Sequence, residues 1–328
     1  MNVLVTGASG FLGSHIAEKL AGAGHHVRAL VGPASNVDFL QTLPGLEFVT
    51  GSVDDPASLP EAVAGVDGVV HAEGRLVGRS AVDLFRANVA GTENLLAAVR
   101  QYAPAIERFV LVSSLAAAAP SADGSPVPDD VEPRPVTDYG RSKLAAERAA
   151  RSYAGRLPVT ILRPPMVYGP RDREALPLFA AAARRVLPSL GDPDGKLSVL
   201  YGPDCARACV LALRAEVPSG SAYFVTDGHA YTRRELVSGL ERAVGKRALV
   251  SFPLPAPVAR AAALASEAYG RLSGRPVALD RRRLADLLAQ WVCDGSGAER
   301  ALSFRPEVDW LEGARRTARW YRENGWLP

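Results

Sequence analysis

The sequence predicts an α/β protein built on a doubly wound parallel sheet. Apolar runs of strand length alternate with helical patterns through the first half of the 328-residue chain, and such runs are typical of parallel strands covered on both faces. A glycine-rich stretch at 6–13, TGASGFLG, stands between an apolar run at 1–5 and a segment with helical periodicity. Strand, glycine turn and helix in this order are the context of a Rossmann dinucleotide-binding unit.

Each glycine of this turn has its own role in such a unit. Gly7 permits the tight turn off the strand, Gly10 leaves room for a pyrophosphate, and Gly13 lets the helix pack closely on the strand. The first N–H groups of the helix favour phosphate, because they are unsatisfied and carry partial positive charge. The predicted cofactor contacts in this turn are Gly7, Ser9, Gly10, Phe11, Leu12 and Gly13. The alternative, a bare turn, is disfavoured by this context.

The remaining elements follow from the same alternation. Strands are expected at 25–31, 46–50, 66–72, 108–114 and 157–164, and a long helix at 83–102. Later the pattern loosens, with Pro- and Gly-rich loops at 164–170, 188–195 and 253–257 and shorter strands at 197–201 and 222–226. We therefore expect an NAD(P)-type Rossmann domain at 1–165 and a smaller substrate-binding lobe at 166–328, with some late segments packing back on the first domain. A crevice between lobes is a usual place for a substrate.

Composition and charge exclude several classes of partner. The formal net charge of +3 is small for this length, so nucleic acid is not expected as a partner. Cys205, Cys209 and Cys293 predict neither a disulfide framework nor, without a histidine cluster, a metal site. No apolar run reaches the ~20 residues of a membrane span and no signal peptide is evident, so a cytoplasmic protein is expected. An Ala- and Leu-rich helix is expected at 257–272. It is interpreted as a plain packing helix, as a cover over an apolar substrate cleft, or as a helix that lies on a lipid surface.

A tyrosine and a lysine with helical spacing carry the predicted chemistry. Tyr139 and Lys143 stand at i,i+4 in YGRSK, before the sixth predicted strand, so their side chains lie one helical turn apart. An ammonium group beside a phenol is expected to lower the phenol pKa from ~10, which suits a general acid or base on an alcohol or carbonyl oxygen. Ser114 ends the fifth predicted strand and is expected to bond the same oxygen. A surface Tyr–Lys pair and a strand-end serine are the alternative.

With these motifs the chain resembles the extended short-chain dehydrogenases/reductases, also called the NAD-dependent epimerase/dehydratase family. The resemblance rests on 6–13, on NVAGTENLL at 88–96, on LVSS at 111–114, on YGRSK at 139–143 and on LRPPMVYGP at 162–170. It implies hydride transfer at the nicotinamide C4 of NAD(P). Tyr139 would exchange the proton, Ser114 would polarise the oxygen, and Lys143 would bind the nicotinamide ribose and tune the tyrosine. Asn88 is similar to a helix asparagine that supports the active site, with a surface amide as the alternative.

The cofactor end of the resemblance is incomplete. NAD-preferring relatives carry an acid near Val31 for the ribose 2′-OH, and NADP-preferring relatives often carry arginine near Gly32, but this chain has neither. Because no acid repels a 2′-phosphate, we expect NAD(P) binding with a slight lean to NADP. Further cofactor contacts are expected at Ser35, Asn36, Ser52, Val53, Ala72, Glu73, Tyr139, Lys143, Pro164 and Met166. Ser52 replaces a common Asp near the adenine, and Val53 is expected to pack on the ring.

Glu73 departs from the family pattern, in which a small residue is usual at this position. It follows the fourth predicted strand and is expected near the nicotinamide half of the cofactor. One interpretation is a solvated acid, alone or paired with Arg75 or Arg79. The other is a group that bonds the substrate or shapes the proton path, because partly buried acids at cofactor sites tend to have shifted pKa values. His71 is expected to pack in its strand.

Two further departures indicate the branch of the family. Sugar-nucleotide dehydratases carry Asp and Glu where this chain has Leu115 and Ala116, so that elimination lacks its acid and base. The stretch RPP at 163–165 is similar to the branch of 3β-hydroxysteroid dehydrogenases and dihydroflavonol reductases. We therefore expect a homodimeric NAD(P)-dependent dehydrogenase or reductase of a ketone or secondary alcohol on a small, largely apolar substrate, steroid-like, β-keto acyl-like or flavonoid-like. A nucleotide-sugar 4-epimerase with the same triad and an NAD(P)-sensing regulator are the alternatives.

Overall fold

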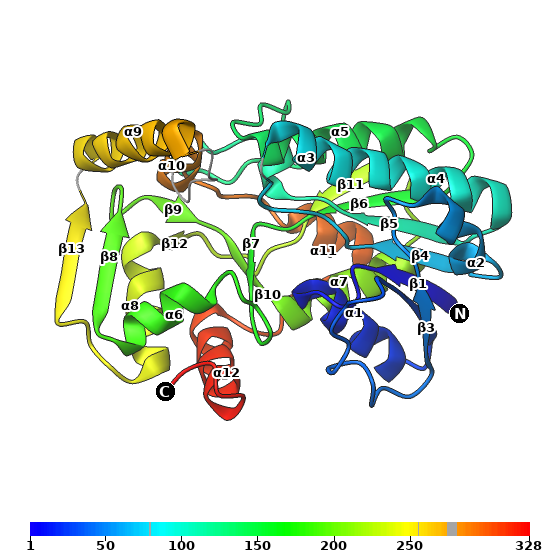
Figure 1. Ribbon diagram of the computed structural model, residues 1–328, viewed down its shortest axis with the longest axis horizontal. Coiled ribbons are helices and arrows are strands. Elements are labelled where there is room, and N and C mark those ends of the chain that lie inside the picture. Colours follow the sequence, from blue (N-terminus) through cyan, green and yellow to red (C-terminus); the bar gives the residue numbers. More distant parts are fainter. Residues whose placement is uncertain (79, 255, 274–280) are drawn as a thin grey trace.

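A sheet of seven parallel strands forms the centre of the computed structural model, which describes residues 1–78, 80–254, 256–273 and 281–328 (Figure 1). In order across the sheet the strands are β11 (Ser221–Phe224), β6 (Val159–Arg163), β5 (Arg108–Val112), β4 (Gly68–His71), β1 (Asn2–Thr6), β2 (His26–Val31) and β3 (Leu46–Thr50). The strand order reverses between β1 and β4, and in such sheets ligands bind at the carboxyl ends of the strands near this point. The predicted doubly wound α/β fold is confirmed.

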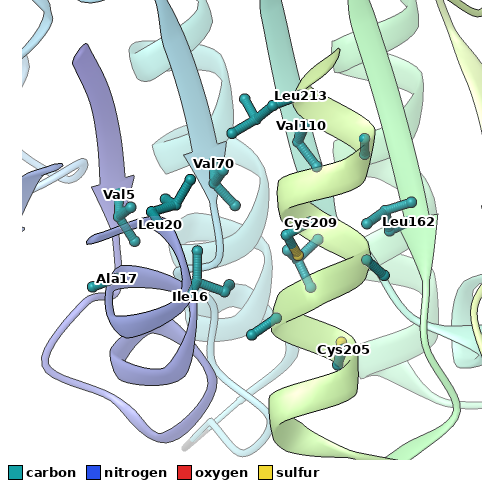
Figure 2. Close-up of a cluster of buried hydrophobic side chains, with 14 of the residues drawn as sticks. Val5, Ile16, Ala17, Leu20, Val70, Val110, Leu162, Cys205, Cys209 and Leu213 are labelled. Carbon is teal, nitrogen blue, oxygen red and sulfur yellow. The ribbon is translucent and has the colours of Figure 1, made fainter. Parts of the chain in front are cut away.

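Helices cover both faces of this sheet. One face carries α1 (Phe11–Gly22), α7 (Gly202–Arg214) and α11 (Ser296–Leu302), and the other carries α2 (Leu59–Val63), α4 (Gly91–Tyr102) and α5 (Asp138–Ser152). Side chains of β1 alternate between the faces, with Val3 and Val5 packed in the core that includes α1 and α7, and Leu4 in the opposite core. Figure 2 shows the first core, in which Cys205 and Cys209 are buried free thiols. This two-sided burial explains why β1 is a continuous apolar run.

The helix predicted at 83–102 begins two residues earlier and contains a π-helical turn. It consists of α3 (Ala81–Phe85), the π turn η2 (Arg86–Ala90) and α4. Ser80 caps its start, because the Ser80 Oγ accepts a 3.2 Å hydrogen bond from the Asp83 N–H. π turns are rare and are frequent at functional sites, and this one carries Asn88.

The second half of the chain contributes both to the sheet and to a smaller lobe. β11 pairs in parallel with β6, and α7 packs against the sheet beside α1. In the described part of the lobe the strands pair as β7 (Met166–Tyr168) with β10 (Val199–Tyr201), β9 (Lys196–Leu197) with β12 (Tyr231–Thr232), and β8 (Val186–Leu190) with β13 (Val250–Leu254). The helices there are α6 (Leu176–Ala183), α8 (Arg233–Val244), α9 (Ala256–Ser273), α10 (Arg281–Leu288) and α12 (Trp310–Glu323). Short helices elsewhere are η1 (Pro56–Ser58) and η3 (Leu115–Ala117).

Three predicted segments of the lobe differ from the structure. Prolines at 188–195 and 253–257 predict loops, whereas parts of both stretches lie in the strands β8 and β13. A two-stranded ribbon leaves one edge of each strand unpaired, and proline is tolerated at such an edge. The strand predicted at 197–201 is split into β9 and β10, because the N–H of Ser198 between them donates a 2.6 Å hydrogen bond to the Trp291 carbonyl.

The helix predicted in the lobe is present, and an aromatic core holds the last helix of the chain. The stretch 257–272 lies within α9, and in the described ranges no helix is long and apolar enough to cross a membrane. α12 buries Trp310 and Tyr321 in an aromatic core together with Tyr168 and Phe179. These aromatic residues therefore anchor the last helix in the core of the lobe.

Candidate active site

A cavity of about 420 Å³ opens at the carboxyl ends of the strands, where β1 turns into α1. Ten predicted cofactor contacts line it, namely Gly7, Ser9, Gly10, Phe11, Leu12, Gly13, Ser35, Ser52, Ala72 and Glu73. The lining also includes Leu30, Gly32, Gly51 and Gly74. Outside it lie Asn36, Val53, Tyr139, Lys143, Pro164 and Met166. Cofactor contact stays a prediction for the residues that line the cavity as well as for those outside it.

The glycine turn leaves the backbone open to a ligand. Gly7 has φ +70°, and a Cβ there would lie 2.9 Å from the Glu73 backbone. A Cβ on Gly13 would overlap the Gly7 carbonyl. Gly10 precedes α1 without a side-chain cap, so N–H groups of the first helical turn remain available. These features fit a dinucleotide, because a pyrophosphate can approach the bare backbone and the helix N-terminus.

The end of the cavity beside β2 carries hydroxyl groups and no charge. The Gly32 N–H donates a 3.1 Å hydrogen bond to the Ser35 Oγ, and the Ser52 N–H donates one of 3.1 Å to the Ser58 Oγ. Among the described lining residues Glu73 is the only one with a charged side chain. The structure therefore holds neither an acid for a ribose 2′-OH nor an arginine for a 2′-phosphate at the end of β2.

Glu73 lines the cavity and is partly buried, rather than extending freely into solvent. Burial raises the pKa of its carboxyl above the ordinary value, and the negative charge of Asp54 raises it further, while Arg75 opposes both. A carboxyl with a raised pKa beside the glycine turn can hold a proton more readily than a surface acid. Its role toward substrate or cofactor stays a prediction.

Packing at the start of α5 brings Ser114 and Tyr139 together. The Thr137 Oγ1 caps α5 by accepting a 2.9 Å hydrogen bond from the Gly140 N–H. A Cβ on Gly140 would overlap the Ala116 carbonyl, so only glycine lets α5 approach η3, the turn that follows Ser114. The Ser114 hydroxyl lies near enough to the Tyr139 phenol to lower the pKa of that phenol by hydrogen bonding.

The electrostatics of Tyr139 differ from the sequence prediction. A lysine one turn away predicts a lowered phenol pKa, whereas burial raises the pKa of Tyr139 to about 12, against the opposing hydrogen bond from Ser114. The physical reason is the position of the Lys143 ammonium, which donates a 3.1 Å hydrogen bond to the Val112 carbonyl at the end of β5. Burial also lowers the pKa of Lys143 itself to about 8, although the negative charge of Glu147 raises it.

Lys143 nevertheless lies at the edge of the glycine cavity. A Cβ on Gly74, which lines that cavity, would lie 2.8 Å from the Lys143 Nζ. Helix α5 and the glycine cavity thus meet at Gly74. Any side chain at this position would push the lysine away.

Asn88 of the π turn connects α5 to the chain after β4. Its Oδ1 accepts a 2.7 Å hydrogen bond from the Arg75 N–H, and its Nδ2 donates to the Arg75 carbonyl over 3.0 Å and to the Ser142 Oγ over 2.8 Å. The Ser142 hydroxyl in turn donates to the Tyr139 carbonyl over 2.7 Å. Asn88 is buried, so the alternative of a surface amide is wrong, and the residue fixes the backbone on both sides of the site.

A second chain of hydrogen bonds runs through His71. The His71 Nε2 lies 3.0 Å from the Thr92 Oγ1, which donates to the Asn88 carbonyl, and the His71 Nδ1 lies 2.6 Å from the Thr6 Oγ1. Burial, with a smaller contribution from the Lys143 charge, lowers the pKa of His71 to about 3. The ring is therefore neutral and structural, as expected, and it joins the ends of β1 and β4 to the π turn.

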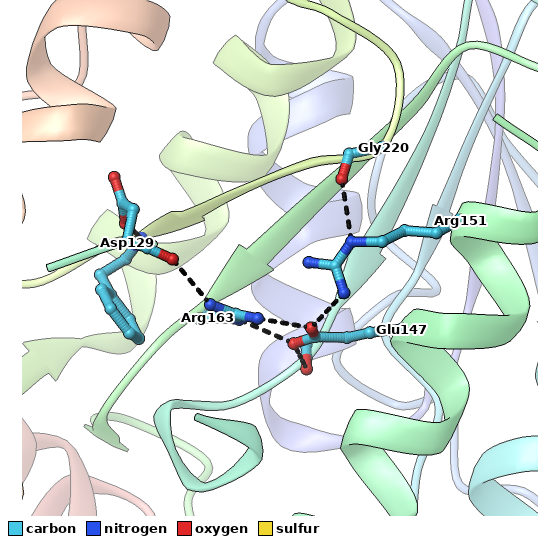
Figure 3. Close-up of polar contacts among 7 residues, drawn as sticks. Asp129, Glu147, Arg151, Arg163 and Gly220 are labelled. Carbon is cyan, nitrogen blue, oxygen red and sulfur yellow. Dashed lines mark hydrogen bonds and ion pairs between the residues drawn. The ribbon is translucent and has the colours of Figure 1, made fainter. Parts of the chain in front are cut away.

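A buried group of charges centred on Glu147 lies between α5 and the sheet (Figure 3). Arg163 of β6 donates to its carboxylate through Nε and Nη2 over 2.9 and 2.7 Å, and Arg151 donates over 3.1 Å. The Ser113 hydroxyl donates over 2.6 Å. Arg163 also donates from Nη1 to the Asp129 carbonyl over 3.1 Å. Charge-assisted bonds of this kind are strong and geometrically specific, so they fix α5 to the ends of β5 and β6.

Sequence reasoning missed this group. A signal existed, because Arg163 ends an apolar strand run, and a cation in such a run needs a buried partner. Glu147 stands one turn after Lys143 on the same helix. This spacing places the two residues on one face of the helix but does not show whether Glu147 faces solvent or the sheet. The sequence alone therefore does not distinguish a solvated Glu147 from the partner of Arg163.

The sheet, the glycine cavity and the group of Ser114, Tyr139 and Lys143 define an NAD(P)-dependent oxidoreductase of the extended short-chain dehydrogenase/reductase type. A sequence model described as the NAD dependent epimerase/dehydratase family matches residues 3–225, more than half of the chain. The protein therefore belongs to the NAD dependent epimerase/dehydratase family.

Named relatives are similar over nearly the whole chain. The ceramide reductase of Caulobacter vibrioides is 32% identical over 99% of this chain and 96% of its own. The 2-alkyl-3-oxoalkanoate reductase of Stenotrophomonas maltophilia is 32% identical over 96% of this chain and 98% of its own. Among solved structures, a double mutant of the dTDP-glucose 4,6-dehydratase DesIV of Streptomyces venezuelae, with NAD bound, is 28% identical with a TM-score of 0.81, covering 100% of this chain and 99% of that one.

Proposed function

We propose that the protein reduces a ketone, or oxidises the corresponding secondary alcohol, on a largely apolar substrate. The observation that carries this proposal is the interaction of the Ser114 hydroxyl with the Tyr139 phenol, one helical turn from the Lys143 ammonium beside Gly74 of the glycine cavity. Ser114 is followed by Leu115 and Ala116, which offer no acid or base for an elimination. Bound NAD(P) would supply or accept the hydride. The names of the two reductases that are 32% identical support a keto substrate with an aliphatic part.

Each residue of the group has a proposed role. Tyr139 would donate a proton to the substrate oxygen, because a phenol with a pKa of about 12 is protonated at neutral pH. Ser114 would polarise the same oxygen through a hydrogen bond. Lys143 would bind the nicotinamide ribose from its place beside Gly74. Asn88 would keep Tyr139 in position through Ser142.

We also propose a slight preference for NADP over NAD. The end of β2 presents Gly32 and Ser35 without an acid, and a carboxylate there would repel a 2′-phosphate. The small residues leave space for that phosphate, and the Ser35 hydroxyl can bond it.

The alternative of a nucleotide-sugar 4-epimerase needs cations for a second diphosphate, and the arginines nearest in sequence have other partners. Arg171 pairs with Glu18 over 3.0 Å. Arg207 pairs with Asp204 and with Glu307, each over 3.2 Å. The Arg173 guanidinium lies 4.7 Å from the centre of the Trp326 ring. Because a diphosphate would have to displace these contacts, they favour the reductase over the epimerase.

A hydride-transfer assay tests the proposal. NADH and NADPH would each be followed with steroids, 3-keto acyl compounds, flavonoid-like ketones and UDP- or dTDP-sugars. We expect cofactor oxidation with an apolar ketone and no inhibition by UDP or dTDP. Micromolar competition by a nucleoside diphosphate with the organic substrate, and not with the cofactor, would favour the epimerase instead.

A further inference from the structure

A groove between α9 and α10 is separate from the glycine cavity and has no role in the chemistry described so far. The two helices lie side by side at one end of the molecule (Figure 1) and pack through the buried side chains of Ala259, Ala263 and Leu284. The groove has a volume of about 440 Å³ and is lined by Arg260, Leu284, Ala285, Leu288 and Ala289. Among the described lining residues, every side chain is thus aliphatic except that of Arg260.

Arg260 is an exposed residue whose guanidinium has no hydrogen bond or ion pair with any residue in the described part of the chain. The five arginines whose guanidinium contacts are described above all have a carboxylate, a carbonyl or a ring as partner, namely Arg151, Arg163, Arg171, Arg173 and Arg207. A guanidinium presents several N–H donors in a plane and matches the two oxygens of a carboxylate or a phosphate. An unpaired arginine on an aliphatic groove therefore complements a ligand that has a chain and an acidic group.

Helix α10 also passes close to the catalytic tyrosine. Burial and the negative charge of Asp286, on α10, both raise the pKa of Tyr139. The end of α10 is tied to the chain that follows Ser114, since the Ser121 N–H donates a 2.8 Å hydrogen bond to the Gln290 carbonyl. One side of α10 thus approaches the proposed proton donor while another lines the groove.

We propose that the groove between α9 and α10 binds the aliphatic chain of the substrate and that Arg260 binds an oxyanion carried by the same molecule. The proposal rests on the proposed function, since the chain would belong to the ketone that reaches Tyr139. It assigns the substrate class more narrowly, as an acyl-type ketone with an acidic group. The acid is a carboxylate or a phosphate, which present the same paired oxygens to a guanidinium.

Binding of chain analogues without a reacting ketone tests the groove directly. Dodecanoate, dodecyl phosphate and the uncharged dodecanol would be titrated into the full-length protein by calorimetry, without cofactor. We expect at least one of the two anions to bind roughly tenfold more tightly than the alcohol, as a charge-assisted hydrogen bond predicts. The tighter of the two anions identifies the acid. Equal affinity of all three ligands would contradict the role of Arg260.

Two variants test separately how the groove binds the aliphatic chain of the ligand and how Arg260 binds its acidic group. Arg260→Gln should bring the anions to the affinity of dodecanol, while the matched Arg156→Gln, at an exposed arginine before β6, should leave the preference unchanged. Ala285→Trp, at an exposed position on the groove wall, should weaken all three ligands several-fold by filling it. Unchanged binding in both Arg260→Gln and Ala285→Trp would overturn the proposal.

The outcome is distinguishable from that of the proposed function. If the chain analogues bind with the expected preference but no ketone accepts hydride, the proposed reductase activity is overturned and the proposed binding in the groove still holds. If ketones are turned over but neither dodecanoate nor dodecyl phosphate binds measurably, the proposed binding in the groove is overturned and the proposed reductase activity still holds. If both proposals hold, the tighter anion should compete with the ketone substrate and not with the cofactor.

Discussion

Glu147 binds Arg163 through both of its carboxylate oxygens, and both side chains are almost completely buried. The pair joins the middle of α5 to the end of β6, one helical turn beyond Lys143. Buried ion pairs add little stability over apolar packing, but removal of one partner leaves a charge without compensation. The pair therefore specifies where α5, and with it the group of Tyr139 and Lys143, sits on the sheet.

Glu147→Gln should lower the free energy of unfolding by about 3 kcal/mol or more, because Arg163 would stay buried without its counter-charge. Chemical denaturation measures this. The matched control is Glu132→Gln, whose partner Arg134 is on the surface with 77% of each side chain exposed, and it should change the midpoint little. Equal midpoints for Glu147→Gln and the wild type would show that the pair does not hold α5.

The rate should fall as the pH rises through about 8. Burial lowers the pKa of Lys143 to about that value, so its ammonium form prevails below pH 8 and is lost above it. With the ammonium form goes the charge that we propose binds the cofactor ribose. The pH profile of kcat/KM measures this loss. Because Glu147 raises the Lys143 pKa, the falling limb should move to lower pH in Glu147→Gln. A pH profile of kcat/KM without a falling limb near this pH would show that activity does not depend on the positive charge of Lys143.

Tyr139→Phe should reduce kcat by roughly 10²–10⁴-fold, the usual contribution of a general acid, while cofactor affinity stays within a few-fold. The change removes the hydroxyl that Ser114 bonds and leaves the ring. Tyr102→Phe, at a tyrosine that is 47% exposed at the end of α4, should keep full activity. Turnover of Tyr139→Phe near that of the wild type would remove this residue from the proton transfer.

Gly10→Val should abolish cofactor binding. The backbone of Gly10 is extended, with φ −84° and ψ 177°, so valine fits its conformation, but a Cβ would already lie 3.2 Å from the Gly7 carbonyl oxygen and its methyl groups would enter the cavity. Quenching of cofactor fluorescence measures affinity. Gly22→Val is the control, because at that end of α1 a Cβ meets nothing within 4 Å. Full affinity in Gly10→Val would place the phosphates elsewhere.

The sequence predicts the sheet and the glycine cavity well because their determinants are local. The apolar run of β1 and the glycines at 7, 10 and 13 occupy one continuous stretch, so their order alone specifies a strand, a turn and a helix start. The same holds for Asn88, which the motif at 88–96 places near the site and the structure joins to Ser142.

What the sequence does not predict depends on tertiary packing. The raised pKa of Tyr139 comes first from burial, and burial is set by elements that pack over α5 rather than by the spacing to Lys143. The pairing of Glu147 with Arg163 depends on how a helix lies across a strand, although only 16 residues separate them. Helical spacing predicts which face of the helix carries Glu147, but it does not predict which element packs against that face.

Gly32→Arg should raise the ratio of kcat/KM for NADPH over that for NADH, by tenfold or so if the guanidinium makes one charge-assisted contact with the 2′-phosphate. The structure has room for it, because a Cβ on Gly32 would meet only the Ser35 Oγ, at an ordinary 3.4 Å, and the position lines the cavity at the end of β2. Steady-state kinetics with both cofactors measure the ratio. Gly32→Gln is the matched control, since it adds a polar chain without charge and should move the ratio less. An unchanged ratio in Gly32→Arg would mean that the ribose does not lie at the end of β2.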